Sequence, residues 1–296
     1  MKTKSKLLSK LFFAIVLASA LQPSWAEKQC MPSENWFIPA DNTIKTKTNF
    51  SATLPSKGII LLGEHHANES HHIWQLDIIK TLHKKQDNLI IGLEMLPRSS
   101  QQALDDWIAG KLSKDQFIEA SGWLNYWSFN FEDYFPILGY ARKNRIPLIA
   151  LNVSHELLQG IKQVGWQAVP ENHREGISDP AKPLEGYIRK LAKSFARHGK
   201  PGAPIDKMAF LHFLQQQLVW DRAMAEAIDK AKAKSENNLI IGLMGSWHII
   251  DKEGVPHQLN SLGHPKVTTL VPWSEHLDCA AVNPAFADAI YGMQLQ

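Results

Sequence analysis

This chain has few cysteines, little net charge and none of the short catalytic signatures that identify a function directly. The HExxH, P-loop, GxSxG and CxxCH patterns are all absent from its 296 residues. The sequence therefore does not indicate the classes of enzyme and cytochrome that those patterns identify. The two cysteines, Cys30 and Cys279, stand near the two ends of the chain. In an oxidising compartment they are compatible with one disulfide or with two free thiols.

Long apolar runs are confined to the first 26 residues. Four lysines precede the run Leu11–Leu21, and Ser24-Trp25-Ala26 gives a small-x-small cleavage sequence. Because this run is too short to span a bilayer, the segment 1–26 is typical of a secretory signal peptide, with a retained amphipathic anchor as the alternative. Cys30 is not placed as a lipoprotein cysteine, because three residues separate it from the cleavage point. We expect an exported protein, periplasmic by default, or else secreted or membrane-associated.

The chain also lacks a strong net charge once the signal is set aside. The full sequence has 32 basic and 29 acidic residues, a formal charge of +3. The signal holds four lysines and no acid, which leaves 28 basic against 29 acidic residues and a charge of −1. The basic excess belongs to the export signal, so nucleic acid is not expected as a partner. The remaining chain is long enough for one α/β domain with a full core.

Five short apolar runs predict buried strands. They are rich in Ile, Leu and Val without polar alternation, which is typical of a parallel sheet covered on both faces. Helical spacing of apolar residues between them favours βαβ units, and therefore an α/β fold with a mainly parallel sheet flanked by helices. We expect strands at Gly58–Leu62, Leu89–Leu93, Pro147–Leu151, Leu239–Leu243 and Lys266–Val271, and helices at Glu69–Leu82, Gln101–Trp107, Phe135–Lys143 and Met208–Lys234.

The region near residues 155–235 departs from this alternation. Prolines and glycines interrupt residues 161–186 and 197–204, and a long helical pattern follows them. We expect residues 27–296 to form the α/β domain, with residues near 155–235 as a helical lid or small subdomain within it.

Polar side chains directly follow the predicted strands. Glu64 and His66 come after the first strand, Glu94 after the second, Asn152 after the third and His248 after the fourth. Open α/β sheets bind ligands outside the carboxyl ends of their strands, so these side chains are expected to share one site. Carboxylate and imidazole groups suit a divalent metal such as zinc or manganese, with His66, Glu94 and His248 as ligands. A carboxylate at this place is equally suited to activate water as a general base.

Plainer interpretations of such residues stay open. A histidine or glutamate after a strand often caps the next helix, and we expect at least one of His71 and His72 to face solvent. Gln217 and Asp221 stand four residues apart on the long helix, so they share a face and are expected beside the site. The alternative for Asp221 is a surface salt bridge with Arg222.

Aromatic residues are concentrated in the segment Trp123–Leu138, which holds seven of them in 16 residues. Aromatic side chains are usually core residues, and that is the first interpretation. The functional interpretation is a flat apolar wall for a planar ligand such as a porphyrin. Tyrosine phenolate and histidine are both competent ligands of haem iron.

At these residues the chain resembles the ChaN family of iron-regulated haem-binding proteins. That family belongs to a superfamily with the erythromycin-esterase-like hydrolases and the TraB/Tiki proteins. The resemblance extends from roughly Lys57 to Pro272. It is carried by LLGEHHANESHH, LIIGLEM, WSFNFEDYFPILGYARKNRIPLIALN, QLVWDRAM and GLMGSWHIIDKEGVPHQL.

The resemblance implies an α/β fold, an envelope location and haem binding linked to iron uptake. As candidate haem ligands we take Tyr134, Tyr187, His173 and His198, because they lie in the aromatic segment or the proposed lid. The expected partners are haem, an outer-membrane haem receptor system and a second copy of the chain in a homodimer. Family members are often lipoproteins, whereas this chain has no cysteine at the expected place.

The sequence and the resemblance therefore predict two alternative functions. The leading one is a periplasmic protein that holds haem through a tyrosine or histidine and takes part in haem and iron uptake. The alternative is a metal-dependent hydrolase, since the resemblance implies a polar site at the same strand ends in the superfamily's hydrolytic branches. The sequence leaves open whether the protein is an enzyme. The catalytic residues of the alternative are Glu64, His66, Glu94 and His248, with Asn152, Gln217 and Asp221 as supporting groups.

Overall fold

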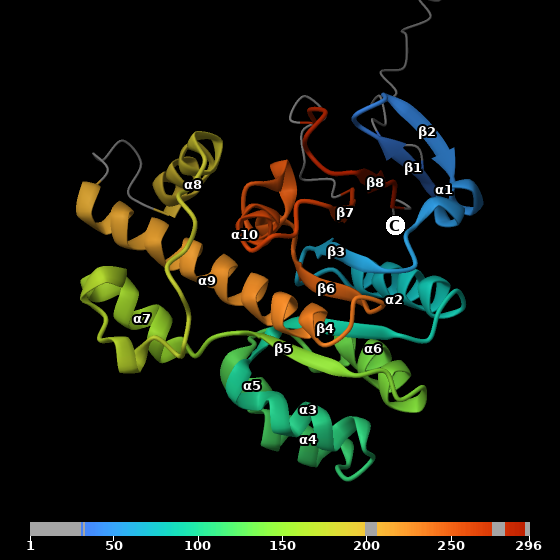
Figure 1. The fold of residues 1–296 in the computed structure, drawn as a ribbon, viewed down its shortest axis with the longest axis horizontal. Helices are drawn as coiled ribbons and strands as arrows, with labels where there is room; N and C mark the ends of the chain where they lie inside the picture. The colour runs from blue at the N-terminus through green and yellow to red at the C-terminus, as the bar shows by residue number, and fades with distance from the viewer. Residues whose placement is uncertain (1–30, 32, 199–205, 274–281, 294–296) are drawn as a thin grey trace, which may run out of the picture. The chain divides into compact units, whose positions relative to one another are not determined.

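The structure is a computed structural model that describes residue 31 and residues 33–198, 206–273 and 282–293 (Figure 1). The predicted signal, residues 1–26, and both cysteines, Cys30 and Cys279, lie outside the described residues. Within the described part of the chain, no helix has the length and apolar character needed to cross a membrane.

The sheet has eight strands, and the five predicted strands lie side by side in it with parallel pairing. The strands are β1 Asn35–Ile38, β2 Thr43–Thr46, β3 Gly58–Glu64, β4 Leu89–Pro97, β5 Leu148–Asn152, β6 Leu239–Gly245, β7 Val267–Pro272 and β8 Ala289–Tyr291. Their order is β2-β1-β8-β7-β3-β6-β4-β5. Only β1 pairs antiparallel, with β2 and with β8, among the strands described. The predicted α/β fold with a mainly parallel sheet is therefore confirmed.

Helices cover both faces of this sheet. They are α1 Lys47–Thr53, α2 Glu69–His83, α3 Gln101–Ile108, α4 Lys114–Ser121, α5 Trp123–Tyr126, α6 Phe131–Lys143, α7 His155–Val164, α8 Glu185–His198, α9 Lys207–Ala233 and α10 Val255–Ser261. On one face α9 contacts β4, β5 and β6 and packs against α7 and α10 (Figure 1), and on the other α2 packs against α6. The alternation of strand side chains separates the two layers. Leu62 of β3 belongs to the core that contains Trp74 of α2, whereas Gly242 of β6 faces Ile228 of α9.

Three of the four predicted helices, α2, α3 and α9, begin and end within one residue of their expected bounds, whereas α6 begins at Phe131, four residues before its predicted start. Before α2, the Asn68 side chain accepts a hydrogen bond from the backbone N–H of His71, as an N-cap does. The region predicted as a lid contains α7, α8 and α9. Tyr187 and Leu191 of α8 pack in one cluster with side chains of α9, and α9 itself lies on the sheet. Whether this region acts as a lid stays a prediction.

Candidate functional site

The carboxyl ends of β3, β4 and β6 bring polar side chains together at one edge of the sheet. Glu64 is the last residue of β3, Glu94 lies in β4, and His248 lies in the short turn directly after β6. Since β6 lies between β3 and β4, these side chains meet although they are far apart in the chain. Together with His66 and Asp221, we call these residues the strand-end cluster.

Glu64 is buried among hydrogen-bonding groups. The Tyr134 hydroxyl donates to Glu64 Oε1 at 2.7 Å, and His66 Nδ1 lies 2.8 Å from the same oxygen. His72 Nε2, from α2, lies 3.5 Å from Glu64 Oε2. Burial alone would raise the pKa of this carboxyl, but the hydrogen bonds with His66 and His72 lower it to about 2. Glu64 is therefore ionised at neutral pH.

His66 is the most exposed side chain of the cluster, with 26% of its surface accessible. Its ring packs edge-on against Trp127, with centroids 4.6 Å apart, and tilted against Phe129 at 5.0 Å. Burial lowers the pKa of His66, but the hydrogen bond with Glu64 and the charge of Glu94 outweigh it and raise the pKa above its ordinary value. Glu64 holds Nδ1, so Nε2 is the ring nitrogen left for another group.

His248 lies between two carboxylates. Its Nδ1 is 2.6 Å from Asp221 Oδ1 of α9, and its Nε2 is 3.3 Å from Glu94 Oε1. The other oxygen of Asp221 accepts a hydrogen bond from the Tyr187 hydroxyl of α8. Burial alone would lower the pKa of His248, but the charges of Glu94 and Asp221 raise it to about 10. His248 is therefore an imidazolium at neutral pH.

Gly245, the last residue of β6, joins the two halves of the cluster. Its N–H donates to Glu94 Oε2 at 2.6 Å. A Cβ at this position would lie 3.0 Å from Cε1 and Nε2 of His66, so a larger residue would displace the ring. The glycine allows the imidazole of His66 to approach the backbone beside Glu94. The result is a nearly closed group of three carboxylates and two imidazoles.

This arrangement does not support the divalent metal predicted at His66, Glu94 and His248. Among the described residues, no group of three or more His, Cys, Asp and Glu side chains is placed to hold a metal ion. Both ring nitrogens of His248 face carboxylates. In this pairing each ring nitrogen of His248 is held by a carboxylate and is not directed at a shared metal position.

Two of the three predicted supporting residues reach the cluster. Asn152 donates from Nδ2 to the backbone carbonyl of Glu94 at 2.9 Å and so ties the end of β5 to β4. Asp221 is buried and faces His248, and the alternative salt bridge is not formed, because the partner of Arg222 is another carboxylate of α9. Gln217 is half-buried one turn earlier on α9 and takes no part in the hydrogen bonds described above.

Two of the four predicted haem ligands lie at the strand-end cluster. Tyr134 and Tyr187 are buried, and each donates its hydroxyl to a carboxylate of the cluster. Burial, followed by the neighbouring carboxylate charge, raises the pKa of both phenols well above 10. His173 is exposed in a short helical turn. His198 is the last residue of α8, and its side chain lies outside the description.

The prediction that His71 or His72 faces solvent is wrong, because both are 1% exposed. His71 Nδ1 accepts a hydrogen bond from the backbone N–H of His65 at 2.9 Å. Burial lowers the pKa of His71 to about 4, so this imidazole is neutral. The helical spacing carried a signal for their burial. The buried residues Gln75 and Ile78 lie four and seven positions after His71, and Gln75 and Ile79 lie three and seven positions after His72.

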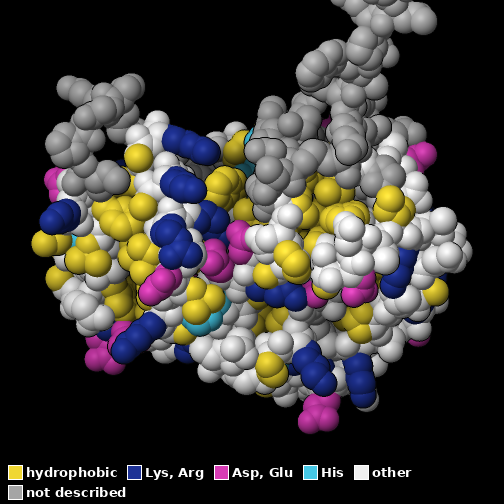
Figure 2. Space-filling model, turned by 90° about the horizontal axis from the view of Figure 1, so that it is seen from above, with side chains coloured by type: hydrophobic (Ala, Val, Ile, Leu, Met, Phe, Trp, Pro, Cys, Tyr) yellow, Lys and Arg dark blue, Asp and Glu magenta, His cyan; other side chains and the backbone are white. Residues whose placement is uncertain are grey.

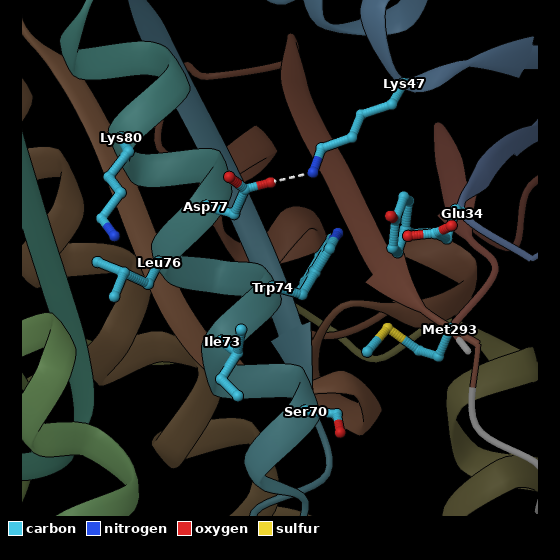
Figure 3. Close-up of a pocket in the computed structure, with 10 residues that line it drawn as sticks. Glu34, Lys47, Ser70, Ile73, Trp74, Leu76, Asp77, Lys80 and Met293 are labelled. Carbon is cyan, nitrogen blue, oxygen red and sulfur yellow. Dashed lines mark ion pairs between the residues drawn. The ribbon is translucent and has the colours of Figure 1, made fainter. Parts of the chain in front are cut away.

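A separate hollow of about 370 Å³ lies beside α2 (Figure 3). Lys47 reaches across it to an ion pair with Asp77 (Figure 3), and Trp74 of α2 stacks on Tyr291 with ring centroids 6.1 Å apart. None of the residues that line this hollow belongs to the strand-end cluster.

Comparison with known proteins agrees with the fold and the motifs. The family model described as haem-binding uptake, Tiki superfamily, ChaN matches residues 50–259. The structure of ChaN of Campylobacter jejuni, which concerns cofacial haem binding, has a TM-score of 0.68 at 19% identity and covers 86% of this chain and 95% of that one. A mutant of the erythromycin esterase EreC in its open conformation has a TM-score of 0.48 at 14% identity, covering 80% and 76%.

A curated relative comes from a plant. Protein RETICULATA-RELATED 5, chloroplastic, of Arabidopsis thaliana is 22% identical over 220 residues, which are 69% of this chain and 29% of that protein. The chain thus spans less than a third of the length of this relative. The family model, by contrast, covers more than half of the chain and includes the three strand ends that form the cluster. The chain therefore belongs to the ChaN family of haem-binding uptake proteins, within the Tiki superfamily.

Proposed function

We propose that this protein binds haem in the periplasm and takes part in haem and iron uptake. The observation that carries the proposal is the family match over residues 50–259, and the fold shared with ChaN of Campylobacter jejuni supports it. Export by the segment 1–26 and delivery from an outer-membrane haem receptor system belong to the same proposal. Haem would supply an iron centre that takes imidazole or phenolate as a ligand.

Histidine is the ligand that the described side chains favour. A phenolate ligand requires a tyrosine that loses its proton readily, and the raised pKa of Tyr134 and Tyr187 opposes this loss. Both hydroxyls also serve as donors inside the strand-end cluster. His173 is exposed and has no such competing role, and His198 is the second histidine in the proposal.

A homodimer is part of this proposal. The haem binding of the Campylobacter jejuni protein is cofacial, so its haem groups stack face to face. Two copies of this chain would supply two haem-holding surfaces for such a stack. The mass of the protein particle in solution should then rise from that of one chain to that of two chains when hemin is added.

Titration of the purified protein with hemin tests the proposal. We expect a shifted Soret band that saturates at a fixed ratio of hemin to chain, with light scattering recorded on the same samples. Tyr134→Phe and Tyr187→Phe should leave the band unchanged, whereas the double variant His173→Ala/His198→Ala should alter it. A spectrum equal to that of hemin mixed with an unrelated protein would overturn haem binding.

Hydrolysis is a second candidate function, favoured by the two imidazole–carboxylate pairs at the strand ends. Glu64 holds Nδ1 of His66, so Nε2 is placed to accept a proton from water as a general base. The imidazolium of His248 would stabilise negative charge that develops on a substrate oxygen. In this hydrolase, side chains of the protein supply both the general base and the positive charge that stabilises the substrate oxygen.

Cleavage of p-nitrophenyl esters tests the hydrolase. His66→Gln should lower kcat/KM by at least about 100-fold, the usual size of a general-base contribution. Since His66 must be neutral and His248 protonated, kcat/KM should rise as pH passes the raised pKa of His66 and fall near pH 10. His173→Ala is the matched control. A rate equal in the wild type and in His66→Gln would overturn this candidate.

A further inference from the structure

A hollow of about 540 Å³ lies between α8 and the segment that follows β6. Its volume is within the roughly 300–1,000 Å³ that small-molecule sites occupy. Trp247, Ile250 and Phe286 form its apolar side, and basic residues of α8 form the other. Figure 2, which looks down on the face where α8 lies in Figure 1, shows Lys and Arg side chains gathered beside a hollowed surface.

The basic side of the hollow follows from the two faces of α8. Tyr187 and Leu191 are buried against α9, and Phe195 packs on Phe213 of α9 at 5.4 Å between ring centroids. With this apolar stripe fixed on α9, the remaining face of the helix must point away from it. That face lines the hollow with Arg189, Lys190, Lys193 and Arg197.

Among the described residues, only some of these cations form ion pairs. Lys190 Nζ lies 3.5 Å and 3.8 Å from two carboxylates that also line the hollow. Arg189 pairs with a glutamate of its own helix. No carboxylate in the described part of the chain pairs with Lys193 or Arg197, which are both exposed. These two cations stand four residues apart, so they are neighbours on one face of the helix.

Trp247 supplies a flat apolar surface beside these cations. Its side chain is 51% exposed, although its neighbours His248 and Ile249 are buried. The turn after β6 fixes His248 inside the strand-end cluster and leaves the indole in the hollow. Covering an exposed indole with a second flat ring removes apolar surface from water, which favours binding.

We propose that this hollow binds the propionate edge of haem, with Lys193 and Arg197 pairing with the two carboxylates and Trp247 lying against the porphyrin face. This inference rests on the proposed haem-binding function and assigns it a surface. A porphyrin combines a flat apolar ring with two carboxylates on one edge. The hollow offers an exposed indole beside two cations that pair with no carboxylate among the described residues. The strand-end cluster is unsuited to the same edge, because it already holds three carboxylates.

Charge reversal at the two cations tests the assignment. Lys193→Glu/Arg197→Glu should weaken hemin binding about tenfold, because two exposed charge pairs become repulsive. Hemin dimethyl ester, whose propionates carry no charge, should bind the wild type and this variant alike. The matched control is Lys230→Glu/Lys234→Glu at the end of α9, which changes the charge equally at the same spacing. Added salt should weaken hemin binding to the wild type more than to the Lys193/Arg197 variant.

The outcomes separate this inference from the function on which it rests. If the wild type binds no hemin, the proposed function fails. If the wild type binds hemin and Lys193→Glu/Arg197→Glu binds it as tightly, the function stands and the assignment of the hollow is overturned. Trp247→Ala gives an independent readout, since it should weaken both hemin and its dimethyl ester, while unchanged affinity for both would also overturn the assignment.

Discussion

Replacing Asp221 with asparagine is the sharpest test of the charge arrangement in the cluster. Asp221 is fully buried, lies 2.6 Å from His248 Nδ1 and accepts a hydrogen bond from Tyr187. Asparagine keeps the size of the side chain but removes its charge, which leaves the imidazolium with Glu94 as its counter-charge. Removing one partner of a buried ion pair costs about 3–5 kcal/mol. We expect Asp221→Asn to lower the free energy of unfolding by this amount at pH 7.

The cost should depend on pH in one direction. The pKa of His248 rises from 6.5 to about 10 on folding, which corresponds to about 5 kcal/mol of stabilisation. This stabilisation is fully present below pH 6.5 and is lost as the pH rises through 10, with roughly half of it gone by about pH 8.5. The difference between the wild type and Asp221→Asn should therefore shrink as the pH rises from 7 to 10.

Urea unfolding at several pH values in this range measures the free energies, and an NMR titration of the His248 imidazole measures its pKa. The control is Tyr187→Phe, which removes the other hydrogen bond of the Asp221 carboxylate without removing charge. This control should cost about 1 kcal/mol, with little dependence on pH. The reasoning is refuted if His248 titrates near 6.5, or if Asp221→Asn costs no more than Tyr187→Phe at pH 7.

Three further predictions concern the Glu64 side of the cluster. Because the pKa of Glu64 falls from 4.5 to about 2 on folding, Glu64 contributes about 3 kcal/mol of stability, which is present above pH 4.5 and is lost as the pH falls through 2. Urea titrations of Glu64→Gln should not show this loss of stability in acid. A variant with the same acid dependence as the wild type would contradict the lowered pKa of Glu64. Tyr134→Phe removes the donor 2.7 Å from Glu64 Oε1 and should lower the free energy of unfolding by about 1–2 kcal/mol, so a neutral effect in urea would speak against that bond. Gly245→Ala should cost about 1–3 kcal/mol and shift the NMR signals of His66, because the new Cβ would lie 3.0 Å from the ring; wild-type spectra and stability would disprove the close packing.

The parallel part of the sheet was predictable because its strands are buried on both faces. Runs such as Gly58–Leu62 and Leu239–Leu243 have no polar alternation, and each became a strand between two helical layers. The strands β1, β2 and β8 were not predicted. They have three or four residues each, and β2 is mostly exposed, so none has an apolar run as long as those of the five predicted strands. Their strand conformation comes from pairing along the edge of the sheet.

The buried histidines show a second limit of the sequence pattern. His71 and His72 are polar residues in the first turn of α2, and by composition they belong on a helix surface. They are buried because α2 starts directly beside Glu64, whose carboxylate lies 3.5 Å from His72. The helical spacing indicated the correct face, but the carboxylate that lies beside His72 comes from the preceding strand.

The sequence alone determined which polar residues stand at the ends of the strands, because burial and strand period are local properties of the chain. Only the tertiary structure decided which of these residues are charged and paired. The imidazolium of His248 depends on Asp221, 27 residues earlier, and the hydroxyl that holds Asp221 comes from Tyr187, a further 34 residues earlier. The pKa of a buried group is set by the distances to such partners, and packing of α8 and α9 against the sheet fixes those distances.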